Sequence, residues 1–298
     1  MKSAFVTITV VTPAYNRETT LPNLYQSLKN QTNKDFTWLV VDDGSTDDTE
    51  ALILGYQQEA PFQVDYVKKE NGGKHTALNV AIERVGTELF FIVDSDDILT
   101  SDAIDTILYD WEKEKVNNLC GLSYLRGFDA TTVIGDSFPD DGEKDTFISM
   151  RYNRGVGGDK AEVWVTGCLK EFGGFPVFDG EKFISESVLW IKIARKYEMI
   201  HRNKIIYITE YLKGGLSETG RTLRFKCPQG MAYGSLETMT KDFTWKIRLK
   251  ESLLFVVYSK FGKKSLREML RCPFPVWVML AYLPGFLLYK SWKYQYKL

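Results

Sequence analysis

The sequence is short of cysteine, histidine and net charge, and each shortage excludes a class of protein. Four Cys and two His are spread over 298 residues without a Cys-x-x-Cys pair, which excludes a disulfide scaffold, a zinc ribbon and a thioredoxin-type site. A net charge of −1 gives no indication of nucleic-acid binding. The 44% hydrophobic and 26% charged residues are typical of a folded globular chain with one large domain or two smaller ones.

The first residues also lack the pattern of a secretory leader. Residues 1–11 contain one lysine and run from a strand-like alternation into a polar turn, without a long apolar region and a cleavage site. Cysteines that lie far apart in the sequence fit a reducing compartment. Both features predict a chain that stays in the cytoplasm.

Apolar runs of strand length alternate with amphipathic stripes of helix length through the first half of the chain. This alternation predicts an α/β fold with a mainly parallel sheet flanked by helices. The expected strands are 5–11, 36–41, 63–67 and 89–93, and the expected helices are 21–28, a segment that opens at 46–48, 77–82 and 101–111.

Polar clusters follow three of these strands, at 13–17, 42–47 and 94–97. In a parallel α/β sheet, ligands bind in the crevice beyond the carboxyl ends of the strands. One acidic turn alone is typical of a helix cap or a solvated loop. Three clusters at the ends of successive strands indicate a single binding site.

The cluster at 94–97, Asp-Ser-Asp-Asp, directly follows a buried-strand pattern. Its carboxylates would repel one another and lose hydration there unless a cation binds them. Carboxylate oxygens suit hard ions such as Mg²⁺ or Mn²⁺, and such an ion stabilises a diphosphate leaving group. The alternative is a cap for the following helix, a role that Ser101 and Asp102 already fill.

Single polar residues in the other clusters are candidates for nucleotide contacts. Asp43 is placed to accept hydrogen bonds from a base or ribose, and Arg17 and Lys74 are cations that can face a diphosphate. The glycine-rich stretch 155–158 lacks the Gly-Lys-Ser/Thr ending and the dinucleotide spacing, so it is not a nucleotide loop.

These clusters belong to four ordered motifs that together resemble glycosyltransferase family 2, inverting enzymes that use nucleotide-sugars and have the GT-A fold. The motifs are VTPAYNR at 11–17, VVDDGSTD at 40–47, NGGKHTALN at 71–79 and VDSDD at 93–97. The resemblance makes Asp94-Ser95-Asp96 the Asp-x-Asp motif, and it implies Mn²⁺ or Mg²⁺ on Asp96 and Asp94. It further implies that the nucleotide is bound by Pro13, Tyr15, Arg17, Asp43, Lys74, Asp94 and Ser95.

The family's catalytic base usually lies in a later Glu-Asp pair near the start of a helix. The matching stretch here is FISESVLW at 183–190, in which Glu186 is retained and Ser187 replaces the aspartate. Glu186 is therefore the first candidate for the base, with Asp179 and Glu181 as alternatives. The family often has a metal-binding His after the last core strand, but residues 205–217 contain none.

The end of the chain differs in charge from the rest. From Lys260 onward the net charge is +7, against −8 for the residues before it. Residues 272–289 carry no charge and are followed by aromatic and basic residues. This pattern favours a peripheral anchor on an anionic membrane surface, over a helix packed on the catalytic domain or a second subunit and over a true span.

The expected organisation is a catalytic domain at 1–220, with a nucleotide-sugar half at about 1–125 and an acceptor half at about 126–220, followed by a helical membrane-proximal region at 221–298. Trp164 in the acceptor half is expected either to stack on an acceptor sugar or to be buried.

The expected activity is transfer of a sugar, with inversion, from a nucleotide donor to a glycan hydroxyl. The resemblance suggests a UDP-sugar donor, a polyprenyl-diphosphate-linked acceptor and a role in bacterial surface polysaccharide assembly at the cytoplasmic face of the membrane. The alternatives are a sugar nucleotidyltransferase, whose glycine-rich N-terminal loop is missing here, and a non-catalytic carbohydrate-binding or scaffold protein of the same fold.

Overall fold

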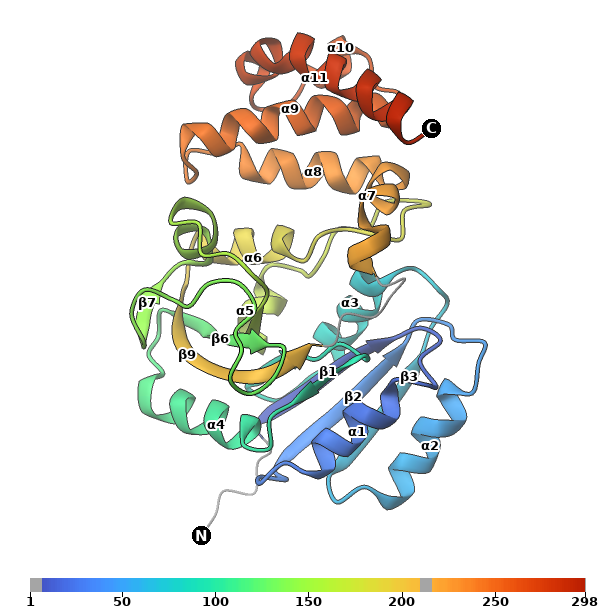
Figure 1. Ribbon diagram of the computed structural model, residues 1–298, viewed down its shortest axis with the longest axis vertical. Helices are drawn as coiled ribbons and strands as arrows, with labels where there is room; N and C mark the ends of the chain where they lie inside the picture. Colours follow the sequence, from blue (N-terminus) through green and yellow to red (C-terminus); the bar gives the residue numbers. More distant parts are fainter. Residues whose placement is uncertain (1–6, 210–215, 298) are drawn as a thin grey trace.

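The structure is a computed structural model that describes residues 7–209 and 216–297. Its centre is a nine-stranded sheet with the order β3-β2-β1-β4-β8-β6-β9-β5, and β7 pairs with β9 (Figure 1). The strands are β1 (Ile8–Ala14), β2 (Phe36–Asp42), β3 (Gln63–Lys68), β4 (Leu89–Ile92), β5 (Asp97–Leu99), β6 (Leu119–Gly127), β7 (Glu143–Asp145), β8 (Lys160–Val165) and β9 (Glu198–Thr209).

The predicted parallel arrangement is confirmed for β1–β4, the strands from which it was inferred, whereas the second half of the sheet is mixed. There β8 runs antiparallel to both β4 and β6, and β5 and β7 run antiparallel to β9. Only β6 and β9 form a parallel pair in this half. The sheet is therefore mixed, because several of these strands are joined by routes other than the β-α-β crossover that parallel neighbours need.

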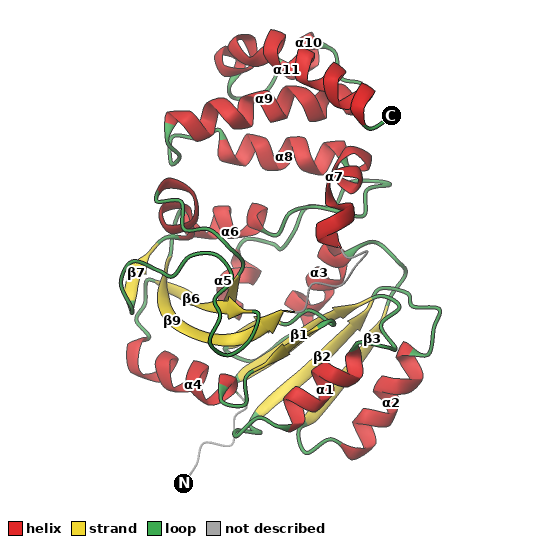
Figure 2. Ribbon diagram, viewed as in Figure 1, coloured by secondary structure: helices red, strands yellow, loops and turns green. Residues whose placement is uncertain are grey.

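Helices cover both faces of the sheet (Figure 2). In β2, Trp38 and Val40 pack with one helical layer while Leu39 and Val41 pack with the other. Both faces of this strand are apolar, which is why it reads as a continuous apolar run in the sequence. The first layer contains α1 (Leu21–Lys29), α2 (Thr49–Glu59) and α4 (Ala103–Glu114), and the second contains α3 (Lys74–Arg84), α5 (Thr166–Glu171) and α6 (Ser187–Ala194).

Helices follow the last strand and stack away from the sheet, with α8, then α9, then α10 and α11 (Figure 1). They have an apolar core of their own. Within residues 7–209 and 216–297, no helix is both long and apolar enough to cross a membrane. These helices are α7 (Leu216–Lys226), α8 (Pro228–Thr238), α9 (Trp245–Phe261), α10 (Leu266–Met269) and α11 (Pro275–Gln295). The domain boundary expected at residue 220 falls inside α7 and stays a prediction.

Candidate active site

Lys74 lies at the centre of the candidate site and connects two of the predicted functional residues. It is the first residue of α3, and its Nζ lies 2.5 Å from Oδ1 of Asp94 and 2.6 Å from Oε1 of Glu186. Burial alone would lower the pKa of Lys74, but the two carboxylates outweigh it and raise that pKa above its ordinary value. The ammonium therefore stays charged and holds the Asp-x-Asp motif and the candidate base together.

Arg126 is a second cation at this site, and the sequence analysis missed it. Its Nη1 lies 3.7 Å from Oδ2 of Asp94 and 3.6 Å from Oδ2 of Asp97, and its guanidinium stacks 3.9 Å from the ring centre of Tyr207. Burial opposes ionisation of Asp94, yet Lys74 and Arg126 together hold the pKa of that carboxyl below its usual range. Arg126 ends β6 as the other clusters end β1, β2 and β4, so the strand-end rule could have found it.

Tyr207 fixes the shape of the turn that carries the acidic residues. Its hydroxyl accepts a hydrogen bond from the backbone N–H of Asp94 at 2.9 Å and donates one to Oδ2 of Asp97 at 2.7 Å. Burial and the nearby Asp94 charge raise the pKa of Asp97 to about 7. Asp97 is thus tied to the scaffold through Tyr207.

The polar cluster that follows β1 contacts the acidic turn that follows β4. Nε of Arg17 donates to Oγ of Ser95 at 3.0 Å, and the charge of Arg17 also helps to lower the pKa of Asp94. Tyr15 is 47% exposed beside it, which leaves a ring face for stacking, whereas Pro13 is buried within β1. The structure therefore joins Arg17, Ser95, Asp94, Lys74 and Glu186 in one continuous cluster.

Asp43 lies in an adjacent polar network and is almost fully buried. Its carboxylate accepts hydrogen bonds from the backbone N–H groups of Gly72 (2.9 Å) and Gly73 (2.7 Å), and it pairs with Nζ of Lys69 at 2.6 Å. These contacts tie the end of β2 to the loop before α3. The predicted contact of Asp43 with a base or ribose stays a prediction.

The two aspartates of the acidic turn can hold a hard divalent ion only if a bound molecule supplies further oxygen atoms. Asp96 is partly exposed and makes no ion pair within the described part of the chain, so its oxygens can coordinate, whereas Asp94 already has Lys74 and Arg126 beside it. No group of three or more His, Cys, Asp or Glu side chains among the described residues could hold a metal. Two carboxylate ligands suit Mg²⁺ or Mn²⁺ when diphosphate oxygens and water complete the shell.

The three candidate bases have different surroundings. Glu186 is the N-cap residue of α6 and reaches Lys74, as described above. Glu181 is buried, and both its carboxylate oxygens accept hydrogen bonds at 2.8 Å from the backbone N–H groups of Gln229 and Gly230, at the start of α8. Asp179 is exposed. Glu181 is thus a helix-capping residue, which leaves Glu186 as the best-placed of the three.

Glu162 is a further carboxyl group that the sequence analysis did not consider. It lies on β8 two residues before Trp164, so both side chains are on the same face of the strand. Trp164 is buried and stacks on Trp190 at 4.2 Å, one helical turn after Glu186. This register brings Glu162 toward the start of α6. The prediction of Trp164 as a buried aromatic is confirmed.

Burial gives Glu162 an unusually high pKa for a carboxyl group. Burial raises the pKa of Glu162 to about 7; Arg151 and Arg126 oppose the rise, and Glu186 adds to it. Lys160, on the same face of β8, is also close enough to interact. Glu162 is therefore a group beside the candidate base that changes charge near neutral pH.

Gly73 is where the loop before α3 packs against the loop that carries Glu186. It has φ +95°, and a Cβ on it would lie 2.0 Å from the carbonyl oxygen of Lys182. Replacing Gly73 by Ala is expected to lower the free energy of unfolding by about 2–4 kcal/mol, because an unfavourable backbone conformation adds to a backbone clash. Denaturant unfolding measures the change.

Gly55 provides the control for this variant. It lies exposed in α2, and a Cβ added to it would meet no atom within 4 Å, so Gly55→Ala is expected to raise the stability by about 0.5–1 kcal/mol. An unfolding midpoint of Gly73→Ala equal to that of the unsubstituted chain would contradict the tight packing between the two loops.

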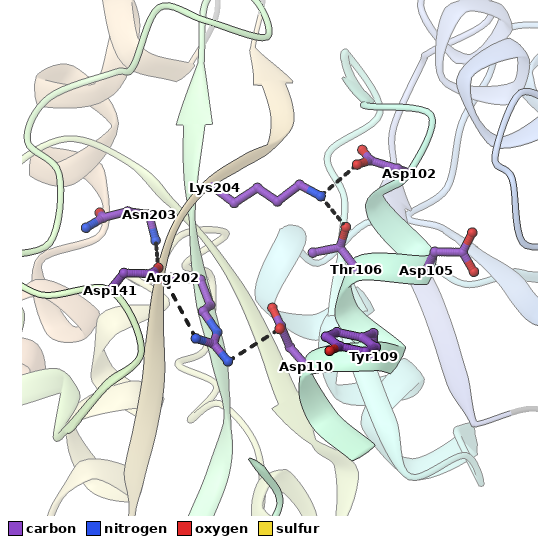
Figure 3. Close-up of a pocket in the computed structure, with 9 residues that line it drawn as sticks. All are labelled: Asp102, Asp105, Thr106, Tyr109, Asp110, Asp141, Arg202, Asn203 and Lys204. Atoms are coloured by element: carbon purple, nitrogen blue, oxygen red, sulfur yellow. Dashed lines mark hydrogen bonds and ion pairs between the residues drawn. The ribbon is translucent and has the colours of Figure 1, made fainter. Parts of the chain in front are cut away.

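A separate groove lies between α4 and β9 (Figure 3). Both of its basic side chains are paired with aspartates: Nζ of Lys204 lies 2.7 Å from Asp102, and Nη2 of Arg202 lies 3.3 Å from Asp110. The exposed ring of Tyr109 lies beside them. These ion pairs link α4 to β9, so we interpret the groove as a contact that stabilises the fold.

The sequence is similar to those of known glycosyltransferases. A family model described as "Glycosyl transferase family 2" matches residues 9–158. The teichoic acid poly(glycerol phosphate) polymerase of Staphylococcus epidermidis is 34% identical over 116 residues, which are 39% of this chain and 15% of that protein. The GalNAc(5)-diNAcBac-PP-undecaprenol β-1,3-glucosyltransferase of Campylobacter jejuni is 26% identical over 212 residues, 67% of this chain and 64% of that protein. The match thus spans less than two thirds of either relative.

Solved structures show the same fold at low sequence identity. S. aureus TarS 1–349 in complex with UDP-GlcNAc has a TM-score of 0.62 and 18% identity, and the match covers 93% of this chain and 79% of that one. The mannosyltransferase PcManGT from Pyrobaculum calidifontis, in complex with GDP-Man and Mn²⁺, has a TM-score of 0.60 and 18% identity, with 96% and 82% covered. At this identity the likeness establishes the GT-A-like architecture alone.

Proposed function

This chain belongs to glycosyl transferase family 2, and from that premise we propose that it transfers a sugar from a nucleotide-diphosphate donor to a hydroxyl group of a glycan acceptor. The observation that carries the proposal is the placement of Lys74 between Asp94 and Glu186. One lysine side chain thus contacts both the proposed donor-binding motif and the proposed carboxylate base. A UDP-sugar is the proposed donor, supported by the complex of the TarS neighbour with UDP-GlcNAc.

The proposed reaction is a single displacement with inversion at the anomeric carbon. Glu186 takes the proton from the acceptor hydroxyl, and that oxygen forms a bond to the anomeric carbon. The bond from this carbon to the diphosphate oxygen breaks at the same time, and the nucleoside diphosphate leaves from the opposite face. Arg17 and Lys74 face the negative charge that develops on the leaving group.

Mn²⁺ or Mg²⁺, when bound by Asp96 and Asp94, would supply further positive charge to the diphosphate. The PcManGT neighbour, whose complex contains Mn²⁺, supports this part of the proposal. The chain's own residues orient these ligands, since Tyr207 and Arg126 hold the turn on which both aspartates lie.

The proposed acceptor is a glycan linked to a polyprenyl diphosphate at the cytoplasmic face of the membrane, in the assembly of a bacterial surface polysaccharide. The Campylobacter relative is named as a transferase that acts on an undecaprenol-linked glycan, and this name supports the proposed acceptor class. The basic and aromatic end of the chain supports a site of action close to lipid.

Calorimetric titration with UDP and GDP, with and without Mn²⁺, tests the proposal. We expect UDP to bind in a metal-dependent way, and we expect Asp96→Ala to weaken this binding at least about tenfold, because it removes an unpaired metal ligand. Binding of neither nucleotide under any metal condition would overturn the donor assignment and favour a carbohydrate-binding or scaffold role.

A further inference from the structure

One face of α11 carries a row of exposed apolar side chains, and the exposed Lys290 lies in the same sector between Leu287 and Tyr294. Successive helical residues are 100° apart, and these positions fall within about one third of the helix circumference. Such a stripe on a soluble protein marks a surface that binds something apolar. The row consists of Val276 (61% exposed), Met279 (56%), Leu280 (65%), Leu283 (66%), Leu287 (60%) and Tyr294 (89%).

The opposite face of α11 is fixed in place by packing. Val278, Ala281 and Gly285 are buried against α9, and a Cβ on Gly285 would lie 2.9 Å from the side chain of Val256. The small residue lets the two helices approach closely. The exposed row is thus held in one orientation by a well-packed helix pair.

Basic side chains lie at the end of α11 and in the segment that precedes this helix. Three lysines at the end of α11 line a shallow groove together with Tyr294 and Gln295, and four more exposed cations lie between α9 and α11. The only acidic residue beyond 260, Glu268, is engaged in the capping box of Ser265. The cations are Lys263, Lys264, Arg267, Arg271, Lys290, Lys293 and Lys297.

We propose that α11 docks with its apolar row on a membrane leaflet rich in anionic lipid headgroups. A leaflet of this kind offers both parts that the surface needs: an apolar layer for the row and negative charge for the lysines. A second copy of the chain fits less well, because two faces with the same strong positive charge would meet. This inference deepens the membrane-proximal role proposed above.

A series of packed helices connects the docking surface to the loop of the candidate base. α11 packs on α9, and α9 packs on α8. The start of α8 is held by Glu181, five residues before Glu186 in the same loop. Docking would therefore fix how far Glu186 lies from the lipid surface, which suits an acceptor that is anchored in lipid.

Flotation of the full chain with vesicles tests the proposal without nucleotide or acceptor. An equal mixture of phosphatidylglycerol and phosphatidylcholine is compared with phosphatidylcholine alone. We expect binding to the mixed vesicles only, weakened by salt, and a loss of at least about tenfold in Leu283→Glu. The triple variant Lys290→Gln, Lys293→Gln and Lys297→Gln is expected to lose most of the preference for the anionic lipid.

Leu54→Glu is the matched control, since Leu54 is a 47% exposed leucine on α2. It is expected to bind vesicles like the unsubstituted chain. Equal vesicle binding by Leu283→Glu, or no binding by the unsubstituted chain, would overturn the proposal. So would a dimer in sedimentation that Leu283→Glu dissociates, because the row would then be a subunit interface. UDP binding is measured separately in Leu283→Glu. If UDP still binds while vesicle binding is lost, the variant affects the docking surface and not the proposed donor site.

Discussion

A chain that carries both Asp94→Asn and Asp96→Asn is expected to lose transferase activity by about a thousandfold or more, equivalent to about 4 kcal/mol of transition-state stabilisation. Two effects combine. The variant loses both carboxylate ligands for a divalent ion, and Lys74 and Arg126 lose the anion that they share, Asp94. Initial rates with a UDP-sugar and a lipid-linked acceptor, at several Mn²⁺ concentrations, measure the loss.

The control for this variant is Asp102→Asn together with Asp105→Asn. It makes the same change in net charge, and the contacts of Asp102 and Asp105 are with Thr100, Lys204, Thr32 and Asn33, outside the candidate site. The Asp102–Lys204 pair is exposed to solvent, so its loss should affect folding little. Full activity in the Asp94 and Asp96 variant would require the proposed mechanism to be abandoned.

The first half of the fold could be predicted because its signals are local. The strands β1, β2 and β4 are each read from one largely apolar run, and each is followed within a few residues by a polar cluster that contributes to the site. The carboxyl ends of parallel strands meet at one edge, so the meeting of Arg17 with Ser95 follows from the element order. Lys74 and Asp94 are brought together in the same way.

The second half could not be predicted because its contacts depend on which distant strands pair. Arg126 and Tyr207 are opposite each other in the β6–β9 ladder, although 81 positions separate their numbers in the sequence. Glu162 comes within electrostatic range of Glu186 only because β8 is inserted between β4 and β6. No local pattern marks Glu181 as a helix cap, since its partners lie 48 and 49 residues further on. The sequence analysis therefore kept Glu181 as an alternative to Glu186.

Glu162→Gln provides the comparison that makes the base assignment testable. The pKa of Glu162 is raised from 4.5 to about 7, so the side chain becomes negative as the pH rises through neutrality. The negative charge that Glu162 then carries favours movement of the acceptor proton into this part of the site, so kcat of the unsubstituted chain is expected to rise between about pH 6 and 8. In Glu162→Gln this rise should disappear while substantial activity remains.

The same substitution has an independent signature in stability. A carboxyl whose pKa is higher in the folded state than in the unfolded state favours folding less as the pH rises from about 4.5 through about 7. Glu162→Gln removes this dependence, so its melting temperature relative to the unsubstituted chain should increase between pH 5 and pH 8. Thermal unfolding at these two pH values separates an electrostatic role from a loss of packing.

Glu186→Gln is expected to lower kcat by about a hundred- to ten-thousandfold at every pH, because an amide cannot take the proton from the acceptor hydroxyl. Glutamine keeps a hydrogen bond to Lys74 and nearly the same volume, so UDP binding should change little. Rates and calorimetric UDP affinity for both variants decide the assignment. If Glu162→Gln abolished turnover while Glu186→Gln kept more than a tenth of it, Glu162 would be the base. Glu186 would then act by positioning Lys74.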